Sequence, residues 1–487
     1  MDTTPTMPKT NHTQPSVNAK ILAQLFPLSS ESAEAAPLKL SQQQLQTLLH
    51  IALATTTHFF GPPNRYLAGV DDPRDPAKIV YPLPCLLFTG MLMFLFHLAA
   101  RRQVALKFRD NAPSAANFAR LFGVENAPHG DTLNHAFKNI DPQQVQECVT
   151  RLVEILIRKK VLERYRLFDQ YYIIAMDGTG IYSFAKRHCD HCLTRTHDGK
   201  TTYYHYVLEA KLVTSDGFSF SLMSEFIENP EANPTKQDCE LNAFHRLAAR
   251  LKERFPRLPI CLSLDGLFAC GPVFLRCHDY NWHYVIVLKE DGLPSVYQDF
   301  VGLAKLQSEE KLTDRILKPV EIKRDFRWAN GIEYRDSKSR EHLLNVIELH
   351  ETKPKDGQPK TTRFMWVTDF SINKGKVRAL AQNAGRDRWI IENQGFNSQK
   401  QGGFALEHLY SHDYTSAKVF YFLLQMAHLF FQLMVASNLF KKYFPRGFGS
   451  LKNFAERLRE AWRNSLLHEQ VLFLLDQLRF QIRLDTS

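Results

Sequence analysis

The stretch YYIIAMDGTG, residues 171–180, decides the fold class. A short apolar run ends at Asp177 and is followed by glycine, which predicts a buried strand that leads into a turn. PICLSLDGLF, residues 259–268, repeats the pattern and ends its apolar run at Asp265. A carboxylate at the end of a buried strand needs a hydrogen-bond partner or a cation. The pair therefore predicts an α/β fold with ligand-binding groups at the carboxyl ends of its strands, although a turn-forming Asp-Gly is the alternative at each position.

The segments around these strands support this fold class. Residues 203–215 and 218–228 read as two strands, and the Asp216-Gly217 pair between them predicts a hairpin. Residues 239–255 have the apolar spacing of an amphipathic helix, and residues 283–289 form a further apolar run. Strands that alternate with helices are typical of α/β proteins.

The composition and the hydrophobic periodicity of the sequence change several times along the chain, and these changes predict its domain organisation. The N-terminus is rich in Thr, Pro and Ser, and helical periodicity then gives way to strands, to a mixed strand-rich stretch and again to helices. We expect a flexible lead at residues 1–37, a helical N-terminal domain and DNA-binding candidate at 38–167, a core at 168–289 and 376–440, an inserted β-rich subdomain at 290–375, and a C-terminal helical segment at 441–487.

Composition excludes some classes of protein. Hydrophobic residues make up 44% of the 487 residues and charged residues 23%, which excludes a wholly disordered or fibrous chain. Lys and Arg total 61 against 51 for Asp and Glu, and a net charge of +10 attracts polyanions such as DNA. The eight cysteines are scattered, which favours reduced thiols in the cytoplasm over a disulfide framework.

Two apolar runs need to be distinguished from membrane spans. Residues 85–100 are too few to cross a bilayer, and residues 419–436 carry polar side chains at helical intervals. We expect both to be buried core helices, and we expect no membrane partner.

A third acid lies in GRDRWIIENQGFNSQK, residues 385–400. Arg388 precedes Glu392 by four residues, so both side chains project from one face of a helix, where an ordinary ion pair is the alternative to a functional role. Two strand-end aspartates and a helical glutamate form a set of hard oxygen ligands that suits two Mg²⁺ ions. Such ions can activate a water or a 3′-hydroxyl against a phosphodiester.

These three motifs resemble those of DDE transposases encoded by bacterial insertion sequences, in the group that carries a β-strand insertion between the second Asp and the Glu. That group has the signature Tyr-x2-Arg-x3-Glu-x6-Lys around its Glu. Arg388 and Glu392 fit it, whereas Gly385 stands at the Tyr position and Lys400 comes one residue late. Seven residues return a helical side chain to the Glu face, but eight carry it roughly 80° round, so only a local distortion would bring Lys400 back.

The resemblance implies an RNase H-like mixed sheet with flanking helices, in which Asp177, Asp265 and Glu392 are the catalytic residues and the Mg²⁺ ligands, with Mn²⁺ able to substitute. It implies that Arg388 and Lys400 touch DNA phosphates. The implied reaction is cleavage at transposon ends followed by joining of the 3′-hydroxyl to target DNA, by a homodimer on DNA in the bacterial cytoplasm at the nucleoid. The residues alone leave open a related Mg²⁺-dependent nuclease, a host-adopted transposase and a DNA-binding protein without catalysis.

Other clusters have competing interpretations. His188-Cys189-Asp190-His191-Cys192 suits zinc if Cys239 or His205 completes it, or is a loop with incidental thiols. Asp369, which ends another apolar run, is the substitute if one acid is misassigned. Glu225, Glu228, Asp238 and Glu240 lie between the two aspartates. Lys236 and Asp238 could assist the site without contacting the metal, but the expected role is to cap and solvate the helix that begins near Cys239. There are two basic runs, at residues 101–109 and 158–166. They could bind DNA, or they could be the solvated faces of helices.

Overall fold

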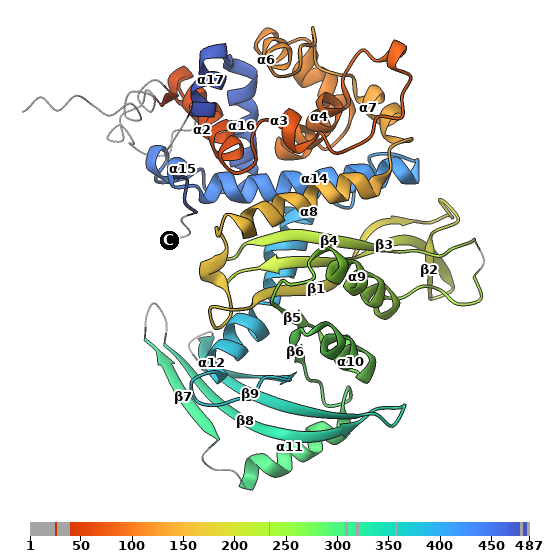
Figure 1. Ribbon diagram of the computed structural model, residues 1–487, viewed down its shortest axis with the longest axis vertical. Helices are drawn as coiled ribbons and strands as arrows, with labels where there is room; N and C mark the ends of the chain where they lie inside the picture. The colour runs from red at the N-terminus through yellow and green to blue at the C-terminus, as the bar shows by residue number, and fades with distance from the viewer. Residues whose placement is uncertain are drawn as a thin grey trace, which may run out of the picture.

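The computed structural model describes residues 25–26, 39–232, 234–306, 310–317, 321–355, 358–477 and 481–484. The predicted lead at residues 1–37 lies outside them, apart from Leu25 and Phe26. Figure 1 shows three tiers along the long axis: helices at one end, a sheet with its own helices in the middle, and long curved strands at the other end. The predicted α/β fold with a helical N-terminal region is confirmed.

The N-terminal tier is built from capped, amphipathic helices. The Ser41 hydroxyl accepts a hydrogen bond from the backbone N–H of Gln44, and the Gln44 side-chain oxygen accepts one from the backbone N–H of Ser41. This reciprocal cap begins the first long helix. Asp141 caps the last one through the backbone N–H of Gln143. The elements in order are α2 (Gln42–Phe60), α3 (Pro63–Tyr66), η1 (Pro76–Lys78), α4 (Leu83–Leu95), α5 (Arg102–Val104), η2 (Ala105–Arg109), α6 (Ala112–Phe122), α7 (Gly130–Phe137), α8 (Pro142–Arg158) and η3 (Glu163–Tyr165).

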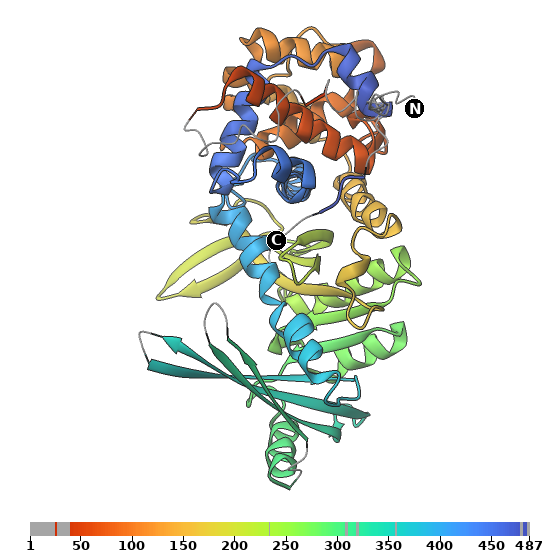
Figure 2. The same ribbon diagram turned by 90° about the vertical axis from the view of Figure 1, so that its left-hand side faces the viewer.

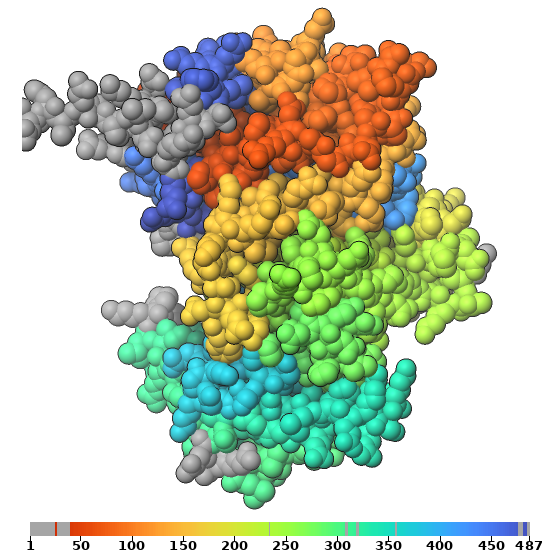
Figure 3. All heavy atoms as spheres, in the orientation of Figure 1, coloured from red at the N-terminus to blue at the C-terminus, as the bar shows by residue number. Residues whose placement is uncertain are grey.

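The C-terminal helices return to this tier. They are α14 (Tyr414–Ala436), α15 (Asn438–Tyr443), α16 (Leu451–Asn464) and α17 (Glu469–Gln477). α16 packs on α2 and α6, and α17 packs on α2, so the two ends of the chain share one helical body. Figure 3 shows the blue C-terminal residues lying among the red and orange N-terminal ones.

α14 joins the helical tier to the sheet. It packs on α4 and α8 and also on a strand of the central sheet, as Figures 1 and 2 show. α14 is long and apolar enough to cross a membrane, but 89% of its most apolar window is buried inside the protein. α4, the shorter apolar helix, is also buried. The prediction that both runs are core helices is confirmed.

The central part of the sheet has the strand order β4-β3-β1-β5-β6. β1 (Tyr172–Phe184) pairs antiparallel with β3 (Lys200–Val213) and parallel with β5 (Ile260–Leu264), which in turn is parallel to β6 (His283–Val287). β4 (Ser219–Ile227) and the short β2 (Leu193–His197) both pair with β3. α9 (Glu240–Arg254) connects β4 to β5, and α10 (Gly271–Tyr280) connects β5 to β6. Because β3 is antiparallel to both β1 and β4, strands β1, β4, β5 and β6 all end at the same edge.

The segment after β6 is strand-rich, as expected, but it does not form a sheet of its own. It consists of α11 (Pro294–Leu306), β7 (Lys311–Ile316), β8 (Ile322–Arg335), β9 (Glu341–Lys355) and β10 (Gln358–Thr368). β10 pairs antiparallel with β6, with Trp366 opposite Val287, so these strands extend the central sheet to ten strands.

A broken helix then crosses the sheet. It runs through α12 (Val377–Ala379), the π-helical segments η5 (Leu380–Arg386) and η6 (Ile391–Asn397), and α13 (Ser398–Gln401). α12 packs on β8, η5 on β5 and β6, and η6 on β1 and β4. Figure 2 shows this light-blue segment passing from the long curved strands towards the helical tier. The crossing brings residues late in the chain to β1, which contains Asp177, and to β5, which is followed by Asp265.

Candidate active site

The two aspartates lie side by side, but the predicted strand end and turn are wrong for Asp177, because β1 continues past it to Phe184 and pairs Asp177 with Glu209 of β3. Met176 of β1 is in parallel register with Leu264 of β5, so Asp177 and Asp265 follow at neighbouring positions on adjacent strands, which are about 4.8 Å apart. Asp177 Oδ1 accepts a hydrogen bond from the backbone of Gly178 at 3.0 Å. Asp265 Oδ1 accepts one from Leu267 at 2.8 Å and caps a short turn. The turn-forming role is therefore present at Asp265, but the register also brings the two carboxylates together.

Arg388 connects the third acid to this pair. Its Nη1 lies 3.3 Å from Asp177 Oδ2 and its Nη2 lies 2.8 Å from Glu392 Oε1. The Arg388 side chain is only 7% exposed, while those of Asp177 and Glu392 keep 19% and 34% of their surface. One buried guanidinium thus holds a strand acid and a helix acid, and the expected i,i+4 pair is part of a larger cluster.

Negative charge exceeds positive charge in this cluster. Burial, together with the nearby charges of Glu392 and Asp265, raises the pKa of Asp177 to about 7 against the opposing effect of Arg388. An acid with this pKa gives up its proton reluctantly in the metal-free protein. A cation bound at the cluster would lower this pKa by opposing the negative charges of Glu392 and Asp265.

The donor set fits Mg²⁺, which prefers carboxylate oxygens and keeps part of its water shell. Among the residues that the structure describes, however, the three acids do not form a set with every ligand atom within 4.8 Å of the others. The Arg388 guanidinium lies between Asp177 and Glu392. Closer convergence of the acids on a metal requires Arg388 to give up at least one of its two carboxylate partners.

The structure adds a fourth acid, Glu240, which the sequence interpretation assigned to capping and solvation. A Cβ on Gly178 would lie 2.8 Å from Glu240 Cδ and 2.4 Å from Tyr206 Cε1, so both side chains cover the backbone next to Asp177. Burial and the nearby charges of Glu240 and Asp177 raise the pKa of Tyr206. Burial and the nearby charge of Asp265 raise the pKa of Glu240.

Topology explains why Glu240 is here. It is the first residue of α9, which leaves β4 at the edge where β1 and β5 also end. The helix N-terminus therefore faces the aspartates. Glu225 and Asp238 instead pair with Arg246 at 2.6 and 2.7 Å, as expected for acids that solvate and stabilise the helix, and Glu228 pairs with Lys418.

Gly385 stands where the related signature has Tyr, and the structure gives a physical reason. A Cβ at Gly385 would lie 2.6 Å from Cε2 of Trp366. The indole of β10 already fills the space that a larger side chain would need. The departure from the signature is therefore matched by a bulky neighbour on the extended sheet.

Lys400 forms its ion pair outside the acid cluster. It lies on α13, and its Nζ contacts Glu407 Oε1 at 2.9 Å. The π-helical segment η6 provides the local distortion that could have brought Lys400 back to the Glu392 face, but its ion-pair partner in the described structure is Glu407. Its contact with DNA remains a prediction.

Asp369 lies at the opposite edge of the sheet. It contacts His283 Nδ1 at 2.7 Å and accepts a hydrogen bond from the backbone of Tyr284 at 3.1 Å, at the start of β6. Asp177 and Asp265 lie where the parallel pairing of β1 with β5 ends, beyond Met176 and Leu264. Asp369 therefore cannot replace any of the three acids.

Parts of the two basic runs make contacts within the protein. Lys159 Nζ donates to the carbonyls of His58 and Phe59 at 2.8 and 2.9 Å. Arg109 donates to the carbonyl of Ala127, and Arg164 to that of Leu484. These cations fix loops and chain ends, which favours a structural role for them.

The comparisons with known proteins bear on the N-terminal half of this architecture. A family model described as DDE_Tnp_1-associated matches residues 64–153, the segment from α3 into α8. Residues 64–153 are therefore similar to a region that is associated with transposases. The match suggests a relationship to the DDE-type transposases, and it ends before the first of the three acids. No curated protein matches the chain at a significant level.

Proposed function

We propose that this chain is a DNA transposase that cuts at the ends of a bacterial insertion sequence and joins the released 3′-hydroxyl to target DNA. The observation that carries the proposal is the placement of Asp177 and Asp265 on adjacent parallel strands, with Glu392 tied to Asp177 through one buried arginine. The transposase-associated region at residues 64–153 supports this class of reaction.

The sheet topology supports an RNase H-like core. Strands β4-β3-β1-β5-β6 form a mixed sheet in which only β3 runs against the others, with helices in the crossovers. The strand-rich insertion falls between the second aspartate and the glutamate, in the order that the motif resemblance implies. Both features bear on the core directly, unlike the N-terminal family match.

In this proposal Asp177, Asp265 and Glu392 hold two Mg²⁺ ions. When bound, Mg²⁺ supplies positive charge that activates the attacking hydroxyl and stabilises the leaving oxygen. β1 and β5 fix the spacing of the two aspartates, and η6 brings in the glutamate. Arg388 holds Asp177 and Glu392 together in the metal-free protein and exchanges a carboxylate for a DNA phosphate when the site is loaded.

The proposed reaction has two phosphoryl transfers. In the first, water attacks phosphorus at the transposon end and the bond from phosphorus to the 3′-oxygen breaks, which leaves a 3′-hydroxyl and a 5′-phosphate. In the second, that 3′-hydroxyl attacks a phosphodiester of the target, and the target's own 3′-oxygen leaves. No oxidant or nucleotide cofactor is consumed in either step.

The remaining parts of the proposal follow from the substrate. A DNA substrate and reduced cysteines favour the bacterial cytoplasm, at the nucleoid. Two transposon ends must be held together, so we expect a homodimer on DNA. Lys400 is proposed to leave Glu407 for a phosphate when the DNA end is bound.

A nicking assay tests the proposal. The substrate is a plasmid that carries the sequences flanking the gene, incubated with Mg²⁺ or with EDTA. Wild-type protein should nick it only with Mg²⁺, and Asp177→Asn, Asp265→Asn and Glu392→Gln should each abolish nicking. Asp369→Asn is the matched control, because it changes a strand-edge aspartate outside the site, and folded protein of this variant should nick normally. Normal nicking by any of the three amide variants would remove that residue from the proposed triad.

A further inference from the structure

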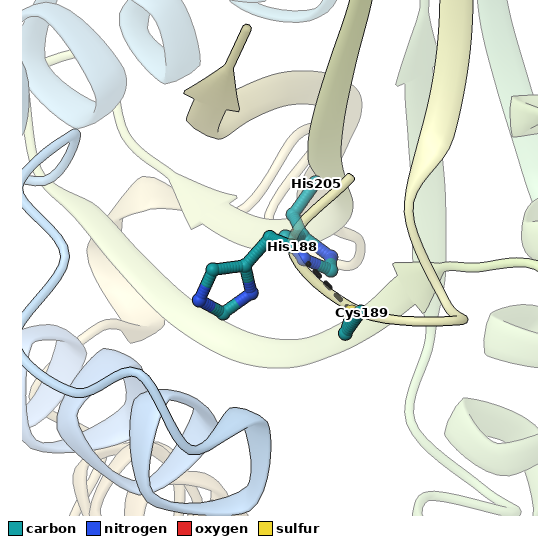
Figure 4. A group of neighbouring side chains, drawn as sticks. All are labelled: His188, Cys189 and His205. Carbon is teal, nitrogen blue, oxygen red and sulfur yellow. Dashed lines mark hydrogen bonds between the residues drawn. The ribbon is translucent and has the colours of Figure 1, made fainter. Parts of the chain in front are cut away.

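Two cysteines and a histidine converge away from the acid cluster. Cys189 and Cys192 lie in the connection between β1 and β2, and His205 lies on β3. The two sulfurs are 3.7 Å apart, and His205 Nε2 lies 3.4 Å from Cys189 Sγ and 3.5 Å from Cys192 Sγ. Figure 4 shows His188 and His205 beside Cys189.

These separations match one face of a tetrahedral zinc site. With zinc–sulfur bonds of about 2.3 Å and zinc–nitrogen bonds of about 2.0–2.1 Å, tetrahedral angles put two sulfurs about 3.8 Å apart and a sulfur and a nitrogen about 3.5 Å apart. The three measured separations lie within about 0.2 Å of these values. The atoms are therefore already spaced for a shared ion.

His188 offers the fourth ligand. Its ligand atom, together with those of Cys189 and His205, forms a group within 4.8 Å. Its Nδ1 is buried and has no hydrogen-bond partner in the described structure. The ring stacks on Phe184 at 4.5 Å, which holds it beside the cluster. We propose that Cys189, Cys192, His205 and His188 bind a structural Zn²⁺ ion.

A network of thiols alone explains this packing less well. His205 is only 1% exposed, and its Nε2 has two sulfurs as its partners, both weak hydrogen-bonding groups. A buried polar group without good partners is costly, and a metal removes that cost. The sequence Cys-x2-Cys followed by twelve residues and His205 has the spacing of the first three ligands of a natural zinc pattern, and the proposed fourth ligand, His188, precedes Cys189. Cys239, the other candidate ligand, is exposed, whereas Cys192 is buried with its sulfur 3.5 Å from His205 Nε2.

The site would fix a basic hairpin. His205 stacks on Tyr414 at the start of α14 at 4.3 Å, so the cluster joins the β1–β2 connection, β3 and α14. Beyond it, Figure 1 shows β2 and the start of β3 projecting from the sheet. Arg187 lies over the ring of Tyr203 at 5.1 Å, and Arg195 over that of Tyr204 at 5.5 Å. Zinc would hold this arm in one orientation relative to β1, the strand that carries Asp177.

The test is the metal content of the purified full-length chain, measured by mass spectrometry after exhaustive dialysis. We expect about one zinc per chain. The Cys189→Ser/Cys192→Ser double variant should fall to near zero, and Cys239→Ser, which removes a cysteine outside the site, should keep its zinc. Full zinc occupancy in the double variant would overturn the proposal.

A second measurement uses only the wild-type chain, so it does not depend on folding of the variant. The protein is stripped with a chelator and titrated with Co²⁺ alone. Tetrahedral thiolate ligation should produce a sulfur-to-cobalt absorption band that saturates at about one equivalent and that Zn²⁺ abolishes. Absence of the band, or a Cys189–Cys192 disulfide in zinc-free protein purified under reducing conditions, would contradict the site. None of these readouts requires the chain to be a transposase.

Discussion

Neutralising Asp177 should stabilise the metal-free protein. Asp177→Asn keeps the size of the side chain and can still accept the hydrogen bond from Gly178, but it removes a charge that burial and the charges of Glu392 and Asp265 disfavour. A rise in pKa from 3.8 to about 7 corresponds to at most about 4 kcal/mol of unfolding free energy once the carboxyl is ionised. We expect a gain of about 1–4 kcal/mol for the variant at pH 8.

The pH dependence gives the prediction its sign. Because the folded-state pKa lies above the unfolded value, the folded protein binds the proton more tightly, and its stability falls as the pH rises from about 4 to about 7. The advantage of the variant should therefore be smallest near pH 4, grow across this interval and level off above pH 7. Urea unfolding of both proteins in EDTA at several pH values measures this difference in unfolding free energy.

Two further measurements complete this test. Asp369→Asn is the control, since Asp369 accepts two hydrogen bonds near His283, and its neutralisation should cost about 1–3 kcal/mol. Millimolar Mg²⁺ should stabilise wild-type protein at pH 8 and should stabilise Asp177→Asn less. A loss of stability in Asp177→Asn at pH 8, or a difference that does not change with pH, would refute the electrostatic argument.

Three other predictions follow from the same site. Arg388→Met should cost about 3–5 kcal/mol at pH 8, because it leaves two carboxylates without their shared cation; unchanged denaturant midpoints would contradict this. Gly385→Tyr restores the signature residue and should destabilise the protein by about 1–3 kcal/mol, because the new side chain clashes with Trp366. Adding Trp366→Ala to this variant should recover part of the lost stability. A Gly385→Tyr protein as stable as wild type would show that the space is not filled. Glu240→Gln should leave the fold intact and raise the Mg²⁺ concentration needed for half-maximal nicking, whereas an unchanged Mg²⁺ dependence would place Glu240 outside the metal's influence.

The strands that carry the site could be predicted from the sequence because the signal is local. An apolar run that ends in Asp-Gly marks Asp177 and Asp265 without knowledge of their neighbours. Parallel pairing of the two runs then brings the aspartates together. The i,i+4 spacing of Arg388 and Glu392 is equally local, and it correctly predicts their ion pair.

The features that were missed depend on contacts between distant segments. Glu240 reads as an ordinary helix start, and only the position of α9 at the strand-end edge brings it to Gly178. The insertion joins the central sheet through pairing of β10 with β6, which no local pattern encodes. His205, and not Cys239, lies beside Cys192 because β3 pairs antiparallel with β1 and β2. The sequence alone does not show this pairing.

The most direct test of the proposed transposase function is strand joining. A DNA duplex that ends in the 3′-hydroxyl of the element's own terminus, labelled on that strand, is incubated with target plasmid, Mg²⁺ and protein. The account predicts that wild-type protein transfers the label to the plasmid and that Glu392→Gln binds the duplex but transfers none. Mg²⁺-dependent nicking without transfer of the label would contradict a transposase and leave a nuclease, and transfer by Glu392→Gln would contradict the assigned site.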